Sequence, residues 1–116
     1  MLAPFLDDIR EGDLIAPRRM AERLHLPVTR LSRLARLNRN TMISRPESPA
    51  VQEKLGQIAR IITHAAQLAG DEARAIIWFR HQPLPGWNRT AEELVEEGLA
   101  REVLDDLDRH SEGVYS

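Results

Sequence analysis

The longest regular pattern in this sequence is an apolar repeat that begins after Ser48-Pro49 and ends at Gly70. Its residues recur four and three positions apart: Val51, Leu55, Ile58, Ile62, Ala65 and Ala69, widened by Ile61, Ala66 and Leu68. This spacing places them on one face of an α-helix. Proline suits the first turn of a helix and glycine suits the position after its last turn. The pattern predicts a helix over residues 49–69, with an apolar stripe wider than one helical hairpin requires.

The composition favours the same fold class. Apolar residues make up 42% of the 116 residues, but aromatic residues make up only 4%. Leu, Ala, Arg and Glu are frequent, and these residues favour helix, whereas strands are enriched in aromatic and β-branched residues. We predict an all-α protein of about six helices. A chain of this length forms one domain, or two small lobes that share a core.

Several classes of chemistry are excluded by what the sequence lacks. Without cysteine it has no disulfide framework, thiolate metal site or cysteine nucleophile. The four histidines, His25, His64, His81 and His110, show no metal-ligand spacing, and no glycine-rich phosphate loop or serine elbow is present. We expect no enzyme, metal, cofactor or small-molecule substrate. No apolar run approaches the about 18 residues of a membrane span, and no leader is evident, so we expect a cytoplasmic protein without membrane contact.

Charge is divided unevenly along the chain, although the net charge is only −2. Residues 16–46 contain eight arginines and one acid, a net charge of +7. From Val51 onward, seven basic residues face twelve acids, a net charge of −5. This asymmetry is typical of a nucleic-acid-binding face joined to an acidic protein-binding module. A solvated helical surface produces the same asymmetry.

The basic segment has the pattern of a helix-turn-helix. Pro17 suits the first turn of a helix, and the small Ala21 suits a close crossing of two helices. The apolar positions of the motif are filled by Met20, Leu24, Leu26, Leu31 and Leu34. His25 occupies the turn position of the motif. Glycine is common at that position, because the residue there adopts a positive φ. We predict that the second helix begins near Pro27 or Val28.

The predicted DNA-binding residues lie on the polar side of that second helix and just beyond it. They are Thr29, Arg30, Ser32, Arg33, Arg36 and Arg39. Arginine forms bidentate hydrogen bonds with guanine edges or phosphate oxygens, and Thr and Ser can bond to bases or backbone. The alternative is an ordinary helical hairpin with an arginine-rich solvated face.

The segments on either side of this motif are shorter. Phe5, Leu6 and Ile9 recur at helical spacing and predict a short amphipathic helix that ends at Gly12. Residues 38–48 are polar and contain Pro46, so we expect a loop that extends the basic surface through Arg39 and Arg45.

After Gly70, Asp71 is a suitable cap for another helix, in which Ala73, Ile76, Ile77 and Arg80 keep the helical period. We expect this helix and the one over 49–69 to form the core and a homodimer seam. A wholly intramolecular core is the alternative.

Both tryptophans lie in the segment from Trp78 to Gly98, WFRHQPLPGWNRTAEELVEEG. Its prolines fix backbone angles and Gly86 suits a tight turn, which together predict a shaped loop. Thr90 and Glu93 have the spacing of a capping box, so a helix begins after Thr90 and continues to about Glu97. Gly98 ends it, and a last helix follows to about His110, which Gly113 breaks. The alternative is that Trp78, Phe79 and Trp87 are the largest pieces of a small core.

The motif from Ala75 to Gly98, followed by a helix and a terminal Gly-Val-Tyr, resembles the toxin-binding domain of the Xre/MbcA/ParS-like antitoxins. That family has Trp-Leu, Pro-Asn, a Leu-Gly pair and Thr-Pro in this order. Here Phe79 stands in place of Leu and Ala91 in place of Pro. The resemblance implies a Xre/helix-turn-helix-like DNA-binding region over 1–47 and a toxin-binding and dimerisation domain over 48–116.

The resemblance also implies a function. An antitoxin of this family neutralises a RES-domain toxin that degrades NAD⁺, because its C-terminal residues enter the active-site cleft, and it can repress its own operon. The residues that this implies for toxin binding are Trp78, Trp87, Arg89, Gly113, Val114, Tyr115 and Ser116. The expected partners are the toxin, operator DNA and a second copy of the chain. The alternative is a dimeric helix-turn-helix transcriptional regulator without a toxin partner.

Overall fold

The computed structural model describes residues 5–115, with side chains for residues 5–111. Within 5–115 it contains eight helices and two short strands, which confirms the all-α class and exceeds the about six helices predicted. The elements are α1 (Phe5–Asp8), β1 (Arg10–Glu11), β2 (Leu14–Ile15), α2 (Pro17–Arg23), α3 (Val28–Leu34), α4 (Arg39–Ser44), α5 (Pro49–Ala69), α6 (Glu72–His81), α7 (Ala91–Glu96) and α8 (Ala100–Tyr115). Two compact units divide between Gly56 and Gln57, inside α5.

The start of the first unit corrects one prediction. The amphipathic helix does not continue to Gly12, because α1 ends at Asp8 and a small antiparallel hairpin of β1 and β2 follows. Gly12 has a φ of 62° in the connection between the strands. Tight hairpin turns require a positive φ there, which glycine adopts without strain. The apolar spacing was still informative, since Phe5 and Ile9 are both buried.

The side chain of Gln52 attaches β2 to the first turn of α5. The Ile15 backbone N–H donates to Gln52 Oε1 at 2.9 Å, and Gln52 Nε2 donates to the Ile15 carbonyl at 3.0 Å. The same Nε2 donates to the Pro46 carbonyl at 2.7 Å. The Gln52 side-chain amide therefore bonds to three backbone groups, two of Ile15 and one of Pro46. Backbone groups that are removed from water without a hydrogen-bond partner destabilise a fold.

Helices α2 and α3 have the boundaries and the turn that the sequence predicts. α2 has Pro17 in its first turn, and α3 begins at Val28. His25 has the positive φ expected for the turn, 59°. All of the predicted packing residues are buried: Met20, Ala21, Leu24, Leu26, Leu31 and Leu34. The apolar pattern therefore identified the packing of these helices correctly.

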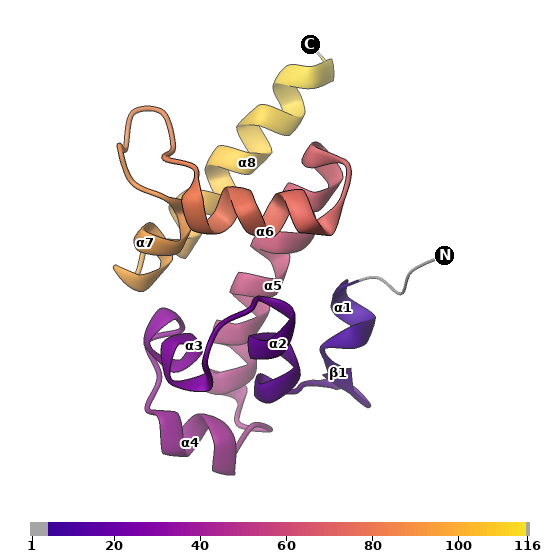
Figure 1. The fold of residues 1–116 in the computed structure, drawn as a ribbon, viewed down its shortest axis with the longest axis vertical. Helices are drawn as coiled ribbons and strands as arrows, with labels where there is room; N and C mark the ends of the chain where they lie inside the picture. The colour runs from indigo at the N-terminus through magenta and orange to yellow at the C-terminus, as the bar shows by residue number, and fades with distance from the viewer. Residues whose placement is uncertain (1–4, 116) are drawn as a thin grey trace. The chain divides into compact units, whose positions relative to one another are not determined.

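The predicted loop over residues 38–48 is wrong, because it contains the helix α4. Asn38 caps this helix by accepting a hydrogen bond from the Thr41 N–H at 3.1 Å. Met42 is the buried residue of α4, which explains the polar sequence: a short surface helix needs only a narrow apolar face. Figure 1 shows α2, α3 and α4 as a cluster of three short helices, and each of them contacts the other two.

In the second unit, the helix boundaries follow the sequence signals. Gly70 has a φ of 97° after the last turn of α5, and Asp71 caps α6 by accepting from the Arg74 N–H at 2.7 Å. α6 packs against α7, and α7 packs against α8. Of the apolar face predicted over this unit, the structure buries Ile58, Ile61, Ile62, Ala65 and Ile76. The core of this unit also contains Ala75, Phe79, Leu94, Val103 and Leu107. The exceptions are Leu68, Ala73 and Ile77, which are exposed, and Ala66 and Ala69, which are partly exposed.

The last helix corrects the prediction for Gly113. α8 does not end near His110, because its backbone continues through Gly113 to Tyr115. A glycine inside a helix lowers its stability by about 1 kcal/mol relative to alanine, and this disadvantage alone need not end the helix. The predicted tail is therefore helical up to Tyr115, whereas Ser116 lies outside the described residues.

Candidate functional site

The loop over residues 82–90 connects α6 to α7, and its two ends are paired. Pro83 and Thr90 form an isolated antiparallel bridge. The Leu84 N–H donates to the Arg89 carbonyl at 2.8 Å, directly inside that bridge. Figure 1 shows the loop, in orange, as an excursion that leaves α6 and returns to α7. The segment is thus a closed loop with a fixed base.

The tip of this loop is a turn organised around Leu84. Its carbonyl accepts from the N–H groups of Trp87 and Asn88, each at 3.1 Å. Gly86 and Asn88 have positive φ values of 86° and 59°, which glycine and asparagine tolerate better than other residues. The Leu84 side chain is only 3% exposed. The prolines and glycine therefore do predict a shaped loop, and a buried leucine anchors it.

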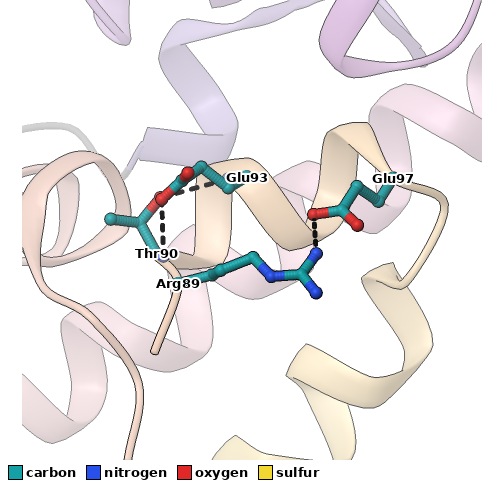
Figure 2. Close-up of polar contacts among 4 residues, drawn as sticks. All are labelled: Arg89, Thr90, Glu93 and Glu97. Atoms are coloured by element: carbon teal, nitrogen blue, oxygen red, sulfur yellow. Dashed lines mark hydrogen bonds and ion pairs between the residues drawn. The ribbon is translucent and has the colours of Figure 1, made fainter. Parts of the chain in front are cut away.

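The capping box at the start of α7 is present as predicted. The Thr90 N–H donates to Glu93 Oε1 at 3.0 Å, and the Glu93 N–H donates to Thr90 Oγ1 at 3.1 Å. The Thr90 hydroxyl also donates to Glu93 Oε1 at 3.1 Å. Figure 2 shows the two side chains facing each other at the helix end. Since Thr90 is also the last residue of the loop, the same contacts fix where the loop ends.

One ion pair fastens the loop to α7, and a second joins the two helices on either side of the loop. Arg89 extends along α7 and bonds to Glu97 at the other end of that helix (Figure 2). The hydrogen bond and the charge of Glu97 raise the pKa of the Arg89 guanidinium above its ordinary value. On the other side, Arg80 Nε lies 3.3 Å from Glu92 Oε1, which joins α6 to α7. The arginine predicted to bind a partner therefore also holds the loop against α7.

The aromatic residues divide between core and surface. Phe79 is fully buried, whereas Trp78 and Trp87 are each partly exposed. The interpretation of these rings as pieces of a small core thus holds for Phe79, while both tryptophans retain exposed surface. Sequence reasoning missed Leu84 as the loop anchor. Its position between Pro83 and Pro85, as the one aliphatic residue in a turn segment, was the available signal.

The remaining residues predicted to bind the toxin lie at the end of the chain. Gly113, Val114 and Tyr115 belong to the last turn of α8, for which the structure describes the backbone. Trp87 and Arg89 are joined within one loop by their backbone hydrogen bonds to Leu84. Trp78 lies in α6 before that loop, and its carbonyl accepts from the Gln82 N–H at 3.1 Å.

The Thr90–Glu93 pair predicts a pH dependence of stability. Hydrogen bonds from the Thr90 N–H and hydroxyl lower the pKa of Glu93. A pKa that is lower in the folded than in the unfolded protein stabilises the fold above the unfolded value, and this stabilisation is lost as pH falls through the folded value. We expect Glu93→Gln, which retains an acceptor but does not titrate, to be less stable than the parent at neutral pH and closer to it in acid. Urea denaturation at both pH values measures this, and a pH-independent difference would contradict it.

The predicted DNA-binding residues differ in accessibility. Thr29, Arg33 and Arg39 are exposed, and Arg30 is partly exposed. Ser32 was predicted incorrectly as a surface residue, because it is 3% exposed and its Oγ donates to the Thr29 carbonyl at 2.7 Å. Arg36 is exposed but lies beyond the end of α3, where it has a φ of 59°. Only part of the predicted set therefore presents a polar face on α3.

Two further kinds of feature are absent from the described residues, a cluster of metal ligands and a helix that could span a membrane. Among residues whose side chains are described, no three His or acidic residues gather as a metal site. None of the helices in 5–115 combines the length and apolar character of a membrane span. Comparisons of the chain with protein-family models, curated proteins and solved structures found no match.

Proposed function

We propose that this chain is the antitoxin of a type II toxin–antitoxin system and neutralises a RES-domain, NAD⁺-degrading toxin by covering its active site. The observation that carries the proposal is the loop over 82–90, which lies within the segment that resembles the family. Its backbone is fixed at the base and at the tip, yet Pro83, Pro85, Gly86, Asn88 and Arg89 are exposed.

A loop of this kind suits protein recognition. Binding orders flexible loops and side chains, which reduces affinity, whereas a loop that is already fixed avoids most of that loss. Tryptophan and arginine are also the residues most enriched among those that dominate binding energy. Trp87 and Arg89 supply both types within the loop, and Trp87 retains exposed surface. Inhibition then requires contact area, and the antitoxin needs no catalytic group of its own.

In this proposal the C-terminal residues enter the toxin's cleft. Because α8 continues to Tyr115, the chain presents this end on a helix instead of on an extended strand. A helical end loses less conformational entropy when it is bound than an unstructured peptide does. The toxin-binding surface would then consist of the loop over 82–90 together with residues 113–116.

Deleting Gly113–Ser116 tests the occlusion mechanism. The probe is a RES-domain toxin, taken from the neighbouring reading frame if that frame encodes one, and NAD⁺ loss is assayed with and without the proposed antitoxin. We expect the full chain to suppress NAD⁺ loss and the truncated chain to leave the rate at that of the toxin alone. Arg101→Ala is the control, since Arg101 is exposed on the same helix and the variant keeps the C-terminus. Equal inhibition by the truncated chain would reject occlusion by these residues.

The basic helices favour a second activity, repression of the chain's own operon. Arg33, Arg39 and Arg45 are exposed, and within residues 5–111 no hydrogen bond or ion pair engages their side chains. Three unpaired arginines on one small unit suit a polyanion such as duplex DNA. The proposal includes action in the cytoplasm as a homodimer. A dimeric regulator without a toxin partner is the competing proposal, and the NAD⁺ assay separates the two.

A further inference from the structure

The turn between α3 and α4 has the same construction as the turn between α2 and α3. After α2, the Leu26 N–H donates to the Ala21 carbonyl at 2.9 Å, around His25 with its φ of 59°. After α3, the Leu37 N–H donates to the Ser32 carbonyl at 2.8 Å, around Arg36 with the same φ. Both are helix ends closed around a left-handed residue. α3 is therefore the second helix of one helix-turn-helix and the first helix of another.

The buried Ser32 has the role in α3 that Ala21 has in α2. Both side chains are small and almost fully buried, 3% and 2% exposed. The Ser32 hydroxyl is satisfied within its own helix by the Thr29 carbonyl, so it needs no partner from outside. A small buried residue at this position is what a first helix requires where the second helix crosses it closely. The burial of Ser32, which removes it from a DNA-binding face, is thus explained if α4 is the second helix.

Helix α4 also exposes more polar residues than α3. α3 buries three of its seven residues, Leu31, Ser32 and Leu34. α4 buries only Met42. The exposed residues of α4 and its C-cap are Arg39, Asn40, Thr41, Ser44 and Arg45. α4 therefore offers more free polar surface than α3, although it is the shorter helix.

The side chains on α4 have the chemistry that base recognition needs. Asn40 and Ser44 lie four residues apart and so share one face of the helix. Asparagine forms bidentate hydrogen bonds with adenine, and threonine can bond to several base edges. The Ser44 hydroxyl donates to the Asn40 carbonyl at 2.7 Å, so it offers a base edge only its acceptor. Within residues 5–111, no hydrogen bond engages the Asn40 side-chain amide. Arg39 and Arg45 flank this face with positive charge, which suits phosphate.

We propose that α4, and not α3, is the helix that enters the major groove of duplex DNA. Asn40, Thr41 and Ser44 then face the base edges, and Arg33, Arg39 and Arg45 contact phosphates. This inference rests on the DNA-binding part of the proposed function and specifies which surface performs it. It assigns a role to three residues that sequence reasoning placed in a loop without one: Asn40, Thr41 and Ser44.

The test compares exposed residues on the two helices, Asn40→Ala on α4 with Thr29→Ala on α3. Binding of the full chain is measured by fluorescence anisotropy on a duplex from the region upstream of its own reading frame and on a scrambled duplex. We expect Asn40→Ala to weaken binding to the upstream duplex by about 5- to 150-fold, the loss of one bidentate base contact, without weakening binding to the scrambled one. Thr29→Ala should leave both affinities unchanged. Arg39→Ala should weaken both and reduce the salt slope by about 1.

The outcomes separate this inference from the proposed function. If Thr29→Ala removes the preference for the upstream duplex and Asn40→Ala does not, α3 reads the DNA and the inference is overturned, while DNA binding stands. If the parent chain shows no salt-dependent binding to either duplex, the DNA-binding part of the proposed function fails and the inference fails with it. The NAD⁺ assay is unaffected by either result. Thermal unfolding by circular dichroism confirms that each variant is folded.

Discussion

Phe79→Ala is expected to lower the free energy of unfolding by about 3–5 kcal/mol, the usual range for removal of a buried aromatic ring. Phe79 is 0% exposed in α6, so the substitution removes buried apolar surface and leaves a cavity that its neighbours fill only partly. The measurement is urea denaturation followed by circular dichroism at the helical band.

The same helix supplies a matched control for this substitution. Ile77 lies two residues earlier in α6 but is 61% exposed, so Ile77→Ala should change the free energy of unfolding by about 0.5 kcal/mol or less. Phe79→Leu should lose less than Phe79→Ala because it leaves a smaller cavity. Equal unfolding midpoints for Phe79→Ala and Ile77→Ala would show that Phe79 is not a core residue.

Leu84→Ala is expected to lower the free energy of unfolding by about 2–4 kcal/mol and to loosen the loop over 82–90. Leu84 is 3% exposed, and its backbone carbonyl accepts the hydrogen bonds of Trp87 and Asn88 that form the tip. Without its side chain in the core, the tip loses its attachment. Acrylamide quenching of Trp87 emission, measured in a Trp78→Phe background, should increase below the unfolding transition.

The control for Leu84→Ala is a substitution at an exposed leucine outside the loop. Leu68 is 40% exposed on α5, so Leu68→Ala should have little effect on stability and none on Trp87 quenching. Unchanged quenching in Leu84→Ala would mean that the backbone bridge and the ion pairs hold the loop by themselves. In the proposed function, a loosened loop also weakens toxin binding, because the loop must then be ordered on association.

The boundaries that sequence predicted correctly depend on contacts between near neighbours. Asp71 and Thr90 cap helices through residues three positions later, and Gly70 and Gly98 adopt the left-handed conformation after a last turn. All the groups that decide such a boundary are present in one short stretch of sequence. The shape of the loop was predictable for the same reason, since Gly86 fixes its turn locally.

The errors arose where a distant part of the fold decides. Whether Ser32 faces solvent or core depends on how α4 crosses α3, and serine is chemically suited to either environment. Helix α4 was not predicted because its sequence is polar, as in a loop, and Met42 is its one buried residue. Gly113 was predicted to end the last helix, but α8 continues through it. The low helix propensity of one glycine is a small contribution, and it does not by itself end a helix. The exposed positions of α4 could therefore be assigned only after the turn at Arg36 was known.

The pairing of Gln52 with Ile15 has a consequence for self-association. A strand at the border of a sheet offers unpaired backbone groups to which another chain can add, a common start of aggregation. At Ile15 both outward groups are already bonded to the Gln52 amide, which occupies the place of a third strand. Two copies of the hairpin therefore cannot join there edge to edge, and a single glutamine side chain protects this border without a covering loop.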